Sequence, residues 1–277
     1  MSEGKTLYIS DLDGTLLNRS AALSEYTKNT LNIMISNGLN FSIATARTSA
    51  SVSIIMKDIK LSYPIILMNG VLIYSTGQKR YVKINSLADE SVSSIIAVLK
   101  AMNITGLMYE LKENELMTYY ESLENKPVSD FIDERKTRYY KTFQHVDDFA
   151  DISPENIIYF TVVDTYARIK PVHDELIKLH GINLTMYKDN YTDHLWYLEI
   201  FSAEASKETA VKFLRDMYDF ERIVGFGDNR NDLPLFKACD TRIAVKNAIK
   251  EVKAAADYIC SANDNDGVVK WLEEHLQ

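Results

Sequence analysis

The chain has 277 residues, of which 46% are hydrophobic and 25% charged, a composition typical of a folded globular protein of one large or two smaller domains. The net charge of −8 at pH 7 disfavours nucleic-acid binding, because an acidic surface repels a phosphate backbone. No apolar run approaches the ~20 residues that span a bilayer, no signal peptide is visible, and Cys239 and Cys260 form no disulfide or zinc pattern, so we expect a cytoplasmic protein without membrane contacts.

The first 84 residues alternate strand and helix signals. The predicted elements are a strand at 7–9, a helix at 25–37 capped by Ser24, a strand at 41–45, a helix at 49–58 and a strand at 64–68. The last strand ends at Asn69-Gly70, a dipeptide typical of a tight turn. Strands that alternate with helices predict a parallel sheet with right-handed crossovers.

The middle of the chain has a different pattern. Ser86 and Asp89 form a candidate capping box for a helix that ends near 102. A hairpin at 105–111 and 115–120 precedes a charged, tyrosine-rich stretch at 130–141. A strand at 157–163, a helix near 165–180 and strands at 183–187 and 194–200 follow. This order predicts an α+β unit in which an antiparallel sheet carries helices on one face.

After residue 202 the alternation returns. The predicted elements are helices at 206–218, 232–238, 248–256 and 268–276 and strands at 222–226, 242–245 and 258–260. The simplest organisation is an α/β domain made of residues 1–84 and 203–277. An inserted α+β domain then occupies residues 85–202.

Two aspartates lie just after the first predicted strand. Asp11 falls at its carboxyl end, where open α/β sheets build their sites, and Asp13 follows two positions later. This arrangement suits a nucleophilic carboxylate with a second carboxyl group that handles protons. Gly14 supplies the backbone freedom of a tight turn. A solvated turn after a strand is an equally good interpretation of this segment alone.

Three residues near other element ends are candidates for binding an anion. The Thr45 hydroxyl ends a strand before a helix N-terminus, although a helix-capping threonine is the simpler interpretation. Arg47 fits a substrate contact or a surface ion pair equally well. Lys207 opens a helix, where its charge opposes the macrodipole, but a solvated surface lysine has the same pattern.

A second acidic segment follows the predicted strand at 222–226. It places Asp228 and Asp232 around a turn, with Asn229 and Asn231 between them. Carboxylate and amide oxygens are hard ligands suited to Mg²⁺. A helix N-terminus with acidic residues in its first turn is the alternative, whereas the spacing of an EF-hand is missing.

Taken in order, these segments resemble the haloacid dehalogenase (HAD) superfamily, in its Cof-like branch of phosphatases with a type IIB cap. The matching segments are Asp11-Leu12-Asp13-Gly14-Thr15, Thr45-Ala46-Arg47, Asn69-Gly70, Lys207 and Gly227-Asp228-Asn229-Arg230-Asn231-Asp232. The resemblance covers nearly the whole chain. It implies a Rossmann-like core, with a parallel sheet and helices on both faces, and an inserted α+β cap.

The resemblance also implies a role for each matching residue. Asp11 would form an aspartyl phosphate, and Asp13 would be the general acid and base. Thr45, Lys207 and Asn231 would hold the phosphoryl group. The Asp11 carboxylate, the Asp13 backbone carbonyl and Asp228 would bind Mg²⁺. Supporting positions would be Asp232, which orients Lys207 or the metal shell, together with Arg47, Asn69 and Gly70.

The leading interpretation is therefore a Mg²⁺-dependent hydrolase of small phosphorylated metabolites, with sugar phosphates among the candidates. A phosphotransferase such as a sugar phosphomutase is the alternative, and a non-catalytic metabolite sensor is a third. The inserted domain would act as a lid. Its candidate substrate-reading residues are Tyr109, Tyr119, Tyr120, Tyr139, Tyr140, Tyr187, Tyr191, His194, Trp196, Tyr197 and Glu199. The sequence indicates neither the physiological substrate nor the oligomeric state.

Overall fold

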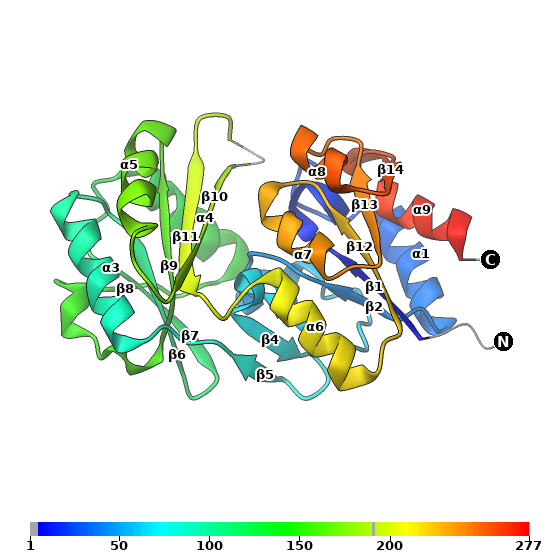
Figure 1. Ribbon diagram of the computed structural model, residues 1–277, viewed down its shortest axis with the longest axis horizontal. Coiled ribbons are helices and arrows are strands. Elements are labelled where there is room, and N and C mark those ends of the chain that lie inside the picture. The colour runs from blue at the N-terminus through cyan, green and yellow to red at the C-terminus, as the bar shows by residue number, and fades with distance from the viewer. Residues whose placement is uncertain (1–4, 190–191, 277) are drawn as a thin grey trace. The chain divides into compact units, whose positions relative to one another are not determined.

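The computed structural model describes residues 5–189 and 192–276, in two compact units (Figure 1). The first unit combines Met1–Lys83 with Ser206–Gln277, and the second is Ile84–Ala205. The sequence prediction set the domain boundaries at 84/85 and 202/203. Tyr191, one of the candidate substrate-reading residues, lies outside the described residues.

A five-stranded parallel sheet forms the centre of the first unit. Its order is β14 (Tyr258–Cys260), β13 (Thr241–Val245), β12 (Arg222–Gly227), β1 (Thr6–Ser10) and β2 (Phe41–Ile43). β1 lies between β12 and β2, and Leu7 and Ile9 are fully buried in it. A parallel bridge from Ala44 to Ile66 extends the sheet toward β3 (Ile65–Leu67). The predicted parallel α/β sheet is confirmed.

Helices cover both faces of this sheet. α1 (Glu25–Ser36) packs against α9 (Gly267–His275), while α6 (Lys207–Tyr218), α7 (Leu233–Lys237) and α8 (Lys250–Ala255) contact one another in series. Figure 1 shows these two groups on opposite sides of the sheet, and α2 (Ser49–Ile55) completes the unit. The Ser24 side chain accepts a hydrogen bond from the amide of Thr27, which confirms the predicted cap of α1.

Two further strands follow β3, and the sequence analysis missed them. β4 (Leu72–Ser75) pairs antiparallel with β3, and β5 (Arg80–Ile84) completes a three-stranded sheet. The predicted tight turn at Asn69-Gly70 is confirmed, with φ angles of +55° and +97°. Both missed strands are short, with four and five residues, and in β5 the charged Arg80 and Lys83 interrupt the apolar residues, which weakens the pattern on which a strand prediction depends.

The second unit contains a six-stranded sheet. Its order is β10 (Ile182–Lys188), β11 (Trp196–Ser202), β9 (Ile157–Asp164), β6 (Leu107–Lys112), β7 (Glu115–Tyr120) and β8 (Gln144–His145). Its pairs are antiparallel except β7–β8. α3 (Asp89–Ala101) and α5 (Tyr166–Leu176) bury an apolar face of the sheet, including Met108, Phe160, Val162, Leu198 and Ile200.

Two expectations for this unit are wrong. The charged stretch near 130–141 is largely a helix, α4 (Lys126–Tyr139), and Phe131 packs against Tyr197 on the face opposite α3 and α5. Helices therefore cover both faces of this sheet, not one. The capping box at Ser86 and Asp89 is also absent, because α3 begins at Asp89 after Ala88 and has no side-chain cap.

Within residues 5–189 and 192–276, no helix combines the length and apolar character needed to cross a bilayer. Cys239 and Cys260 are both free thiols.

Candidate active site

Side chains from three neighbouring strands meet at the carboxyl edge of the parallel sheet. Asp11 follows β1, and its amide donates to the Phe226 carbonyl of β12 at 3.0 Å. Asp228 directly follows β12. The amide of Ala44, just after β2, donates to the Ser10 carbonyl at 2.9 Å. The sheet ladder therefore fixes the positions from which the acidic residues project.

Lys207 lies between two buried carboxylates. Its ammonium nitrogen is 2.6 Å from Asp11 Oδ1 and 2.7 Å from Asp232 Oδ1. The three side chains are at most 5% exposed. The interpretation of Lys207 as a solvated surface lysine is therefore wrong. A Ser206 capping box begins α6 at this point and holds the lysine at the helix N-terminus.

Asp232 fixes the second acidic segment. Its Oδ2 accepts hydrogen bonds from the amides of Asp228 at 2.8 Å and Asn229 at 3.0 Å. A Cβ at Gly227 would lie 2.6 Å from the Asp232 Cβ, so only glycine leaves room for this side chain. Because Asp232 Oδ1 accepts a hydrogen bond from Lys207, both carboxylate oxygens of Asp232 have donors within the protein.

Burial and mutual repulsion control the protonation of the cluster. Burial, helped by the charge of Asp232 and opposed by Lys207, raises the pKa of Asp11 to about 8. Burial and the charges of Asp232 and Asp11 raise the pKa of Asp228 well above its ordinary value. Burial lowers the pKa of Lys207, but the adjacent carboxylates outweigh it and hold that pKa above its ordinary value. One lysine therefore stays charged among three carboxylates, and the cluster attracts a further cation or a proton.

The donor set suits Mg²⁺. Asp11, Asp228 and Asp232 each offer an oxygen within 4.8 Å of the others. Asp228 Oδ1 accepts a hydrogen bond from the Thr15 hydroxyl at 2.9 Å, and the second oxygen of Asp11 and of Asp228 accepts none within the described part of the chain. Asp11 and Asp228 therefore each keep one carboxylate oxygen without a donor among the residues described, and such hard oxygens are the ligands that Mg²⁺ prefers.

The Asp13 carboxylate binds a different side chain, that of Arg47. The Arg47 Nε and one terminal nitrogen donate hydrogen bonds of 2.6 Å, one to each of the two Asp13 oxygens. This pair is only partly buried. Of the two interpretations left open for Arg47, the structure places it in an ion pair, and the partner is itself a candidate catalytic residue.

Thr45 is fully buried beside this pair. Its hydroxyl accepts the amide of Arg47 at 3.1 Å, and its carbonyl accepts the amide of Asn69 at 3.0 Å. The helix that follows is preceded by Thr48, so the interpretation of Thr45 as a helix cap is wrong. This backbone hydrogen bond brings Thr45 and Asn69 together.

Gly70 brings the turn after β3 against the start of α6. A Cβ at Gly70 would lie 2.1 Å from the carbonyl oxygen of Ser206, and its φ of +97° belongs to the region that favours glycine.

The half-buried Asn231 side chain makes no hydrogen bond within the described residues.

Sequence reasoning missed the contacts of Thr15 and Asn247. Thr15 binds Asp228, and Asn247 Nδ2 donates to the Gly14 carbonyl at 2.7 Å, where φ is +77°. Thr15 lies in a segment that resembles the family, but the partners of both residues are more than 200 residues away in the sequence. No local pattern reports such a contact.

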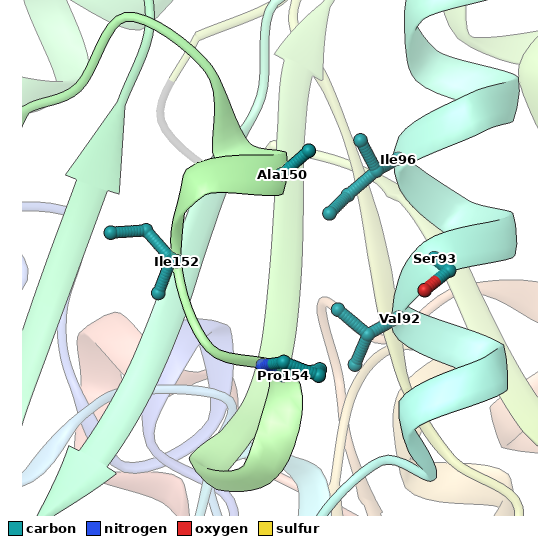
Figure 2. A pocket seen from close by; sticks show the side chains of 6 residues that line it. All are labelled: Val92, Ser93, Ile96, Ala150, Ile152 and Pro154. Atoms are coloured by element: carbon teal, nitrogen blue, oxygen red, sulfur yellow. The ribbon is translucent and has the colours of Figure 1, made fainter.

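A pocket elsewhere offers no comparable chemistry. It lies between α3 and the segment 150–154 of the second unit (Figure 2). Its lining carries no ionisable side chain and consists of Val92, Ser93, Ile96, Ala150, Ile152 and Pro154.

The chain is similar to several known proteins. Residues 8–272 match the family model of haloacid dehalogenase-like hydrolases. A relative from Bacillus subtilis (strain 168), 5-amino-6-(5-phospho-D-ribitylamino)uracil phosphatase YwtE, is 27% identical over 96% of each chain. Among solved structures, TM0651 from Thermotoga maritima is 27% identical, with a TM-score of 0.77 over 98% of this chain and 97% of that one. The HAD subclass IIB sugar phosphatase BT4131 is 20% identical, with a TM-score of 0.75 over 98% of each chain, and shows the fold alone.

Proposed function

Since the chain belongs to the haloacid dehalogenase-like hydrolases, as a phosphoric monoester hydrolase, we propose that it hydrolyses small phosphorylated metabolites in a Mg²⁺-dependent reaction through an aspartyl phosphate. Sugar phosphates are the first candidates for its substrate. The relative from Bacillus subtilis supports this choice, because the substrate in its name carries the phosphate on a ribityl chain. In this proposal the first unit is the catalytic core and the second is its cap.

The buried array of Asp11, Lys207 and Asp232 carries the proposal. A phosphate dianion and a carboxylate nucleophile repel each other, so the site must supply positive charge. Lys207 does so, and Asp232 holds it beside Asp11. Asp232 accordingly acts as a positioning residue.

The first chemical step forms the phosphoenzyme. An Asp11 oxygen attacks phosphorus while the bond from phosphorus to the ester oxygen breaks. Asp13 gives a proton to the departing oxygen, and Lys207 and Thr45 hold the phosphoryl oxygens. Asn231, whose amide has no protein partner in the described residues, is available for a phosphoryl oxygen or a water.

Asp13 must change partners during the cycle. In the structure both of its carboxylate oxygens accept from Arg47. Carrying a proton requires Arg47 to release one of these oxygens, and the freed guanidinium is suited to bind an anionic group of the substrate. In the second step Asp13 takes a proton from water, which attacks the aspartyl phosphate and frees Asp11 and inorganic phosphate.

Mg²⁺ would be held by the open oxygens of Asp11 and Asp228 and by the backbone carbonyl of Asp13. When bound, it supplies charge that offsets the repulsion between nucleophile and phosphate. Thr15 orients Asp228 through its hydroxyl.

The test is phosphate release from a panel of phosphorylated metabolites, with and without Mg²⁺. The panel includes sugar phosphates and 5-amino-6-(5-phospho-D-ribitylamino)uracil. We expect release that requires Mg²⁺ and is lost in Asp11→Asn, whose folding is checked by its unfolding curve. Asp216→Asn changes an aspartate outside the site and is the matched control.

Two results would contradict the proposal. Substantial release by Asp11→Asn would exclude an aspartyl phosphate on this residue. An isomerised sugar phosphate in place of free phosphate would indicate a phosphotransferase that protects the intermediate from water.

A further inference from the structure

A single turn after β13 contacts both segments that carry the acidic residues of the candidate active site. The turn covers residues 246–249 and leads into α8. The Asn247 side-chain amide donates to the Gly14 carbonyl at 2.7 Å, and the Ile249 amide donates to the Asp228 carbonyl at 3.0 Å. Because Gly14 directly follows Asp13, this turn holds the main chain of both segments to which the proposed function assigns Mg²⁺ ligands.

The Gly14 carbonyl lies at an easily rotated point of the first segment. The backbone angles of Gly14 are φ +77° and ψ −3°, and those of Asp13 are φ −74° and ψ 119°, so neither residue is helical. Glycine allows the peptide groups on either side of it to rotate at little cost. Gly14 is buried, and a buried carbonyl requires a hydrogen-bond partner. Asn247 is that partner, and its hydrogen bond limits the rotation.

Hydrogen bonds on both sides of Asp13 define the position of its carbonyl. Before it, the Asp11 amide donates to the Phe226 carbonyl of β12 at 3.0 Å. After it, Asn247 holds the Gly14 carbonyl. The carbonyl that is assigned to Mg²⁺ therefore lies between two held points of the main chain, and loss of the second one lets the Asp13–Gly14 peptide turn.

Asn247 is itself oriented by a later segment of the chain. The main-chain amide of Asn263 donates to Asn247 Oδ1 at 3.0 Å, which directs the Nδ2 group of Asn247 toward Gly14. The side-chain amide of Asn263 also donates to the Leu17 carbonyl at 2.8 Å. The two asparagines thus make the same kind of contact with one segment, but Asn247 contacts the residue next to Asp13 and Asn263 a residue further along.

We propose that Asn247 is a positioning residue for the metal site, which fixes the Asp13 carbonyl relative to Asp228 and thereby sets the affinity for Mg²⁺. This inference rests on the proposed function, of which the Mg²⁺ ligands are a part. In it Asn247 contacts neither the metal nor the substrate and acts through the Gly14 carbonyl. Removal of such a partner outside the ligands themselves changes metal affinity by about 10- to 100-fold.

The melting temperature of the full-length protein over a range of MgCl₂ concentrations tests the proposal without catalysis. A metal that binds only the folded state raises the melting temperature once its concentration exceeds the dissociation constant. Asn247→Leu removes the side-chain donor at nearly constant size, and we expect the dissociation constant for Mg²⁺ to rise about 10-fold or more. Asn247→Asp keeps the shape and the acceptor for Asn263 but loses the donor. We expect it to weaken Mg²⁺ binding as well, although its added charge by itself favours a cation.

Asn263→Leu is the matched control. It removes the contact with the Leu17 carbonyl but keeps the main-chain amide that orients Asn247. We expect it to bind Mg²⁺ as wild type does, even where it lowers the melting temperature of the metal-free protein. Equal weakening in Asn263→Leu would mean that the whole segment is loosened, and would overturn the positioning role. Wild-type Mg²⁺ affinity in both Asn247 variants would overturn it too.

Kinetics separates this role from the proposed function. We expect Asn247→Leu to need more Mg²⁺ for half-maximal phosphate release, with an unchanged KM for the ester and with kcat restored at saturating Mg²⁺. A kcat that stays low at saturating Mg²⁺ would contradict a role in metal affinity. If the wild type binds Mg²⁺ but hydrolyses none of the panel, the proposed function fails while the melting temperatures still decide the role of Asn247. If Mg²⁺ leaves the wild-type melting temperature unchanged, the inference fails.

Discussion

Gly70→Ala tests whether the turn after β3 positions the lysine of the site. The added methyl group would lie 2.1 Å from the Ser206 carbonyl oxygen and 2.5 Å from its carbon. Both are backbone atoms at the start of α6, one residue before Lys207. Because backbone cannot rotate away, the turn and the helix must separate by about 1 Å to reach ordinary contact distance.

The magnitude follows from two separate costs. A left-handed backbone costs a non-glycine residue about 1–2 kcal/mol, and overpacking adds about 1–3 kcal/mol. We therefore expect Gly70→Ala to lower the free energy of unfolding by about 2–5 kcal/mol. A displacement of about 1 Å at Lys207 is expected to lower kcat about 100-fold.

Gly38→Ala is the matched control. Gly38 has a φ of +101°, close to that of Gly70, but nothing lies within 4 Å of the position of its Cβ. It therefore reports the backbone strain alone, with wild-type kcat. The assays are urea unfolding and phosphate release with Mg²⁺ at saturating substrate. If Gly70→Ala keeps the kcat of Gly38→Ala, the contact with Ser206 does not position Lys207 and the reasoning is wrong.

Three further predictions concern the acidic cluster. Lys207→Met removes the cation between Asp11 and Asp232, so we expect a loss of about 3–5 kcal/mol in urea unfolding and a kcat lower by at least about 100-fold; wild-type stability would contradict the buried ion pairs. Asp228→Asn removes a charged ligand, and we expect Mg²⁺ to raise its melting temperature less than that of wild type at equal concentration. The pKa of Asp11 is about 8 in the folded, metal-free protein and 3.8 in the unfolded chain. Between these two pH values only the folded protein keeps this proton, so the free energy of unfolding falls as the pH rises. Mg²⁺ should therefore raise the melting temperature more at pH 9 than at pH 6, and Asp11→Asn should reduce this difference.

The sequence predicted the parts of the site whose signal is local. A strand followed by Asp11 and Asp13, and another followed by Asp228 and Asp232, already place four carboxyl groups at one edge of a parallel sheet. Lys207 carried only a weak local signal, an unfavourable place at a helix N-terminus. Its burial depends on contacts 196 and 25 residues away, which no local pattern contains.

The second unit was harder to predict because its polar residues do not follow the usual pattern. α4 is rich in charged residues, so its apolar spacing is faint, and it was not assigned as a helix. Lys141 lies at the end of the same charged stretch, where a solvated lysine is the natural expectation. Lys141 is nevertheless buried against Tyr109, on the sheet face opposite α3 and α5, and only the three-dimensional structure shows this contact.

The contacts that fix the cluster all lie within the first unit. β1 pairs with β12, Gly70 packs on Ser206, and Lys207 binds Asp11, so each contact joins chain before residue 84 to chain after residue 205. The geometry of the proposed nucleophile therefore depends on how the two chain ends pair, and not on side chains of the inserted segment. Substitutions at exposed side chains of the inserted segment should accordingly leave the contact between Asp11 and Lys207 intact, whereas substitutions of Gly70 and Asp232 should affect every substrate alike.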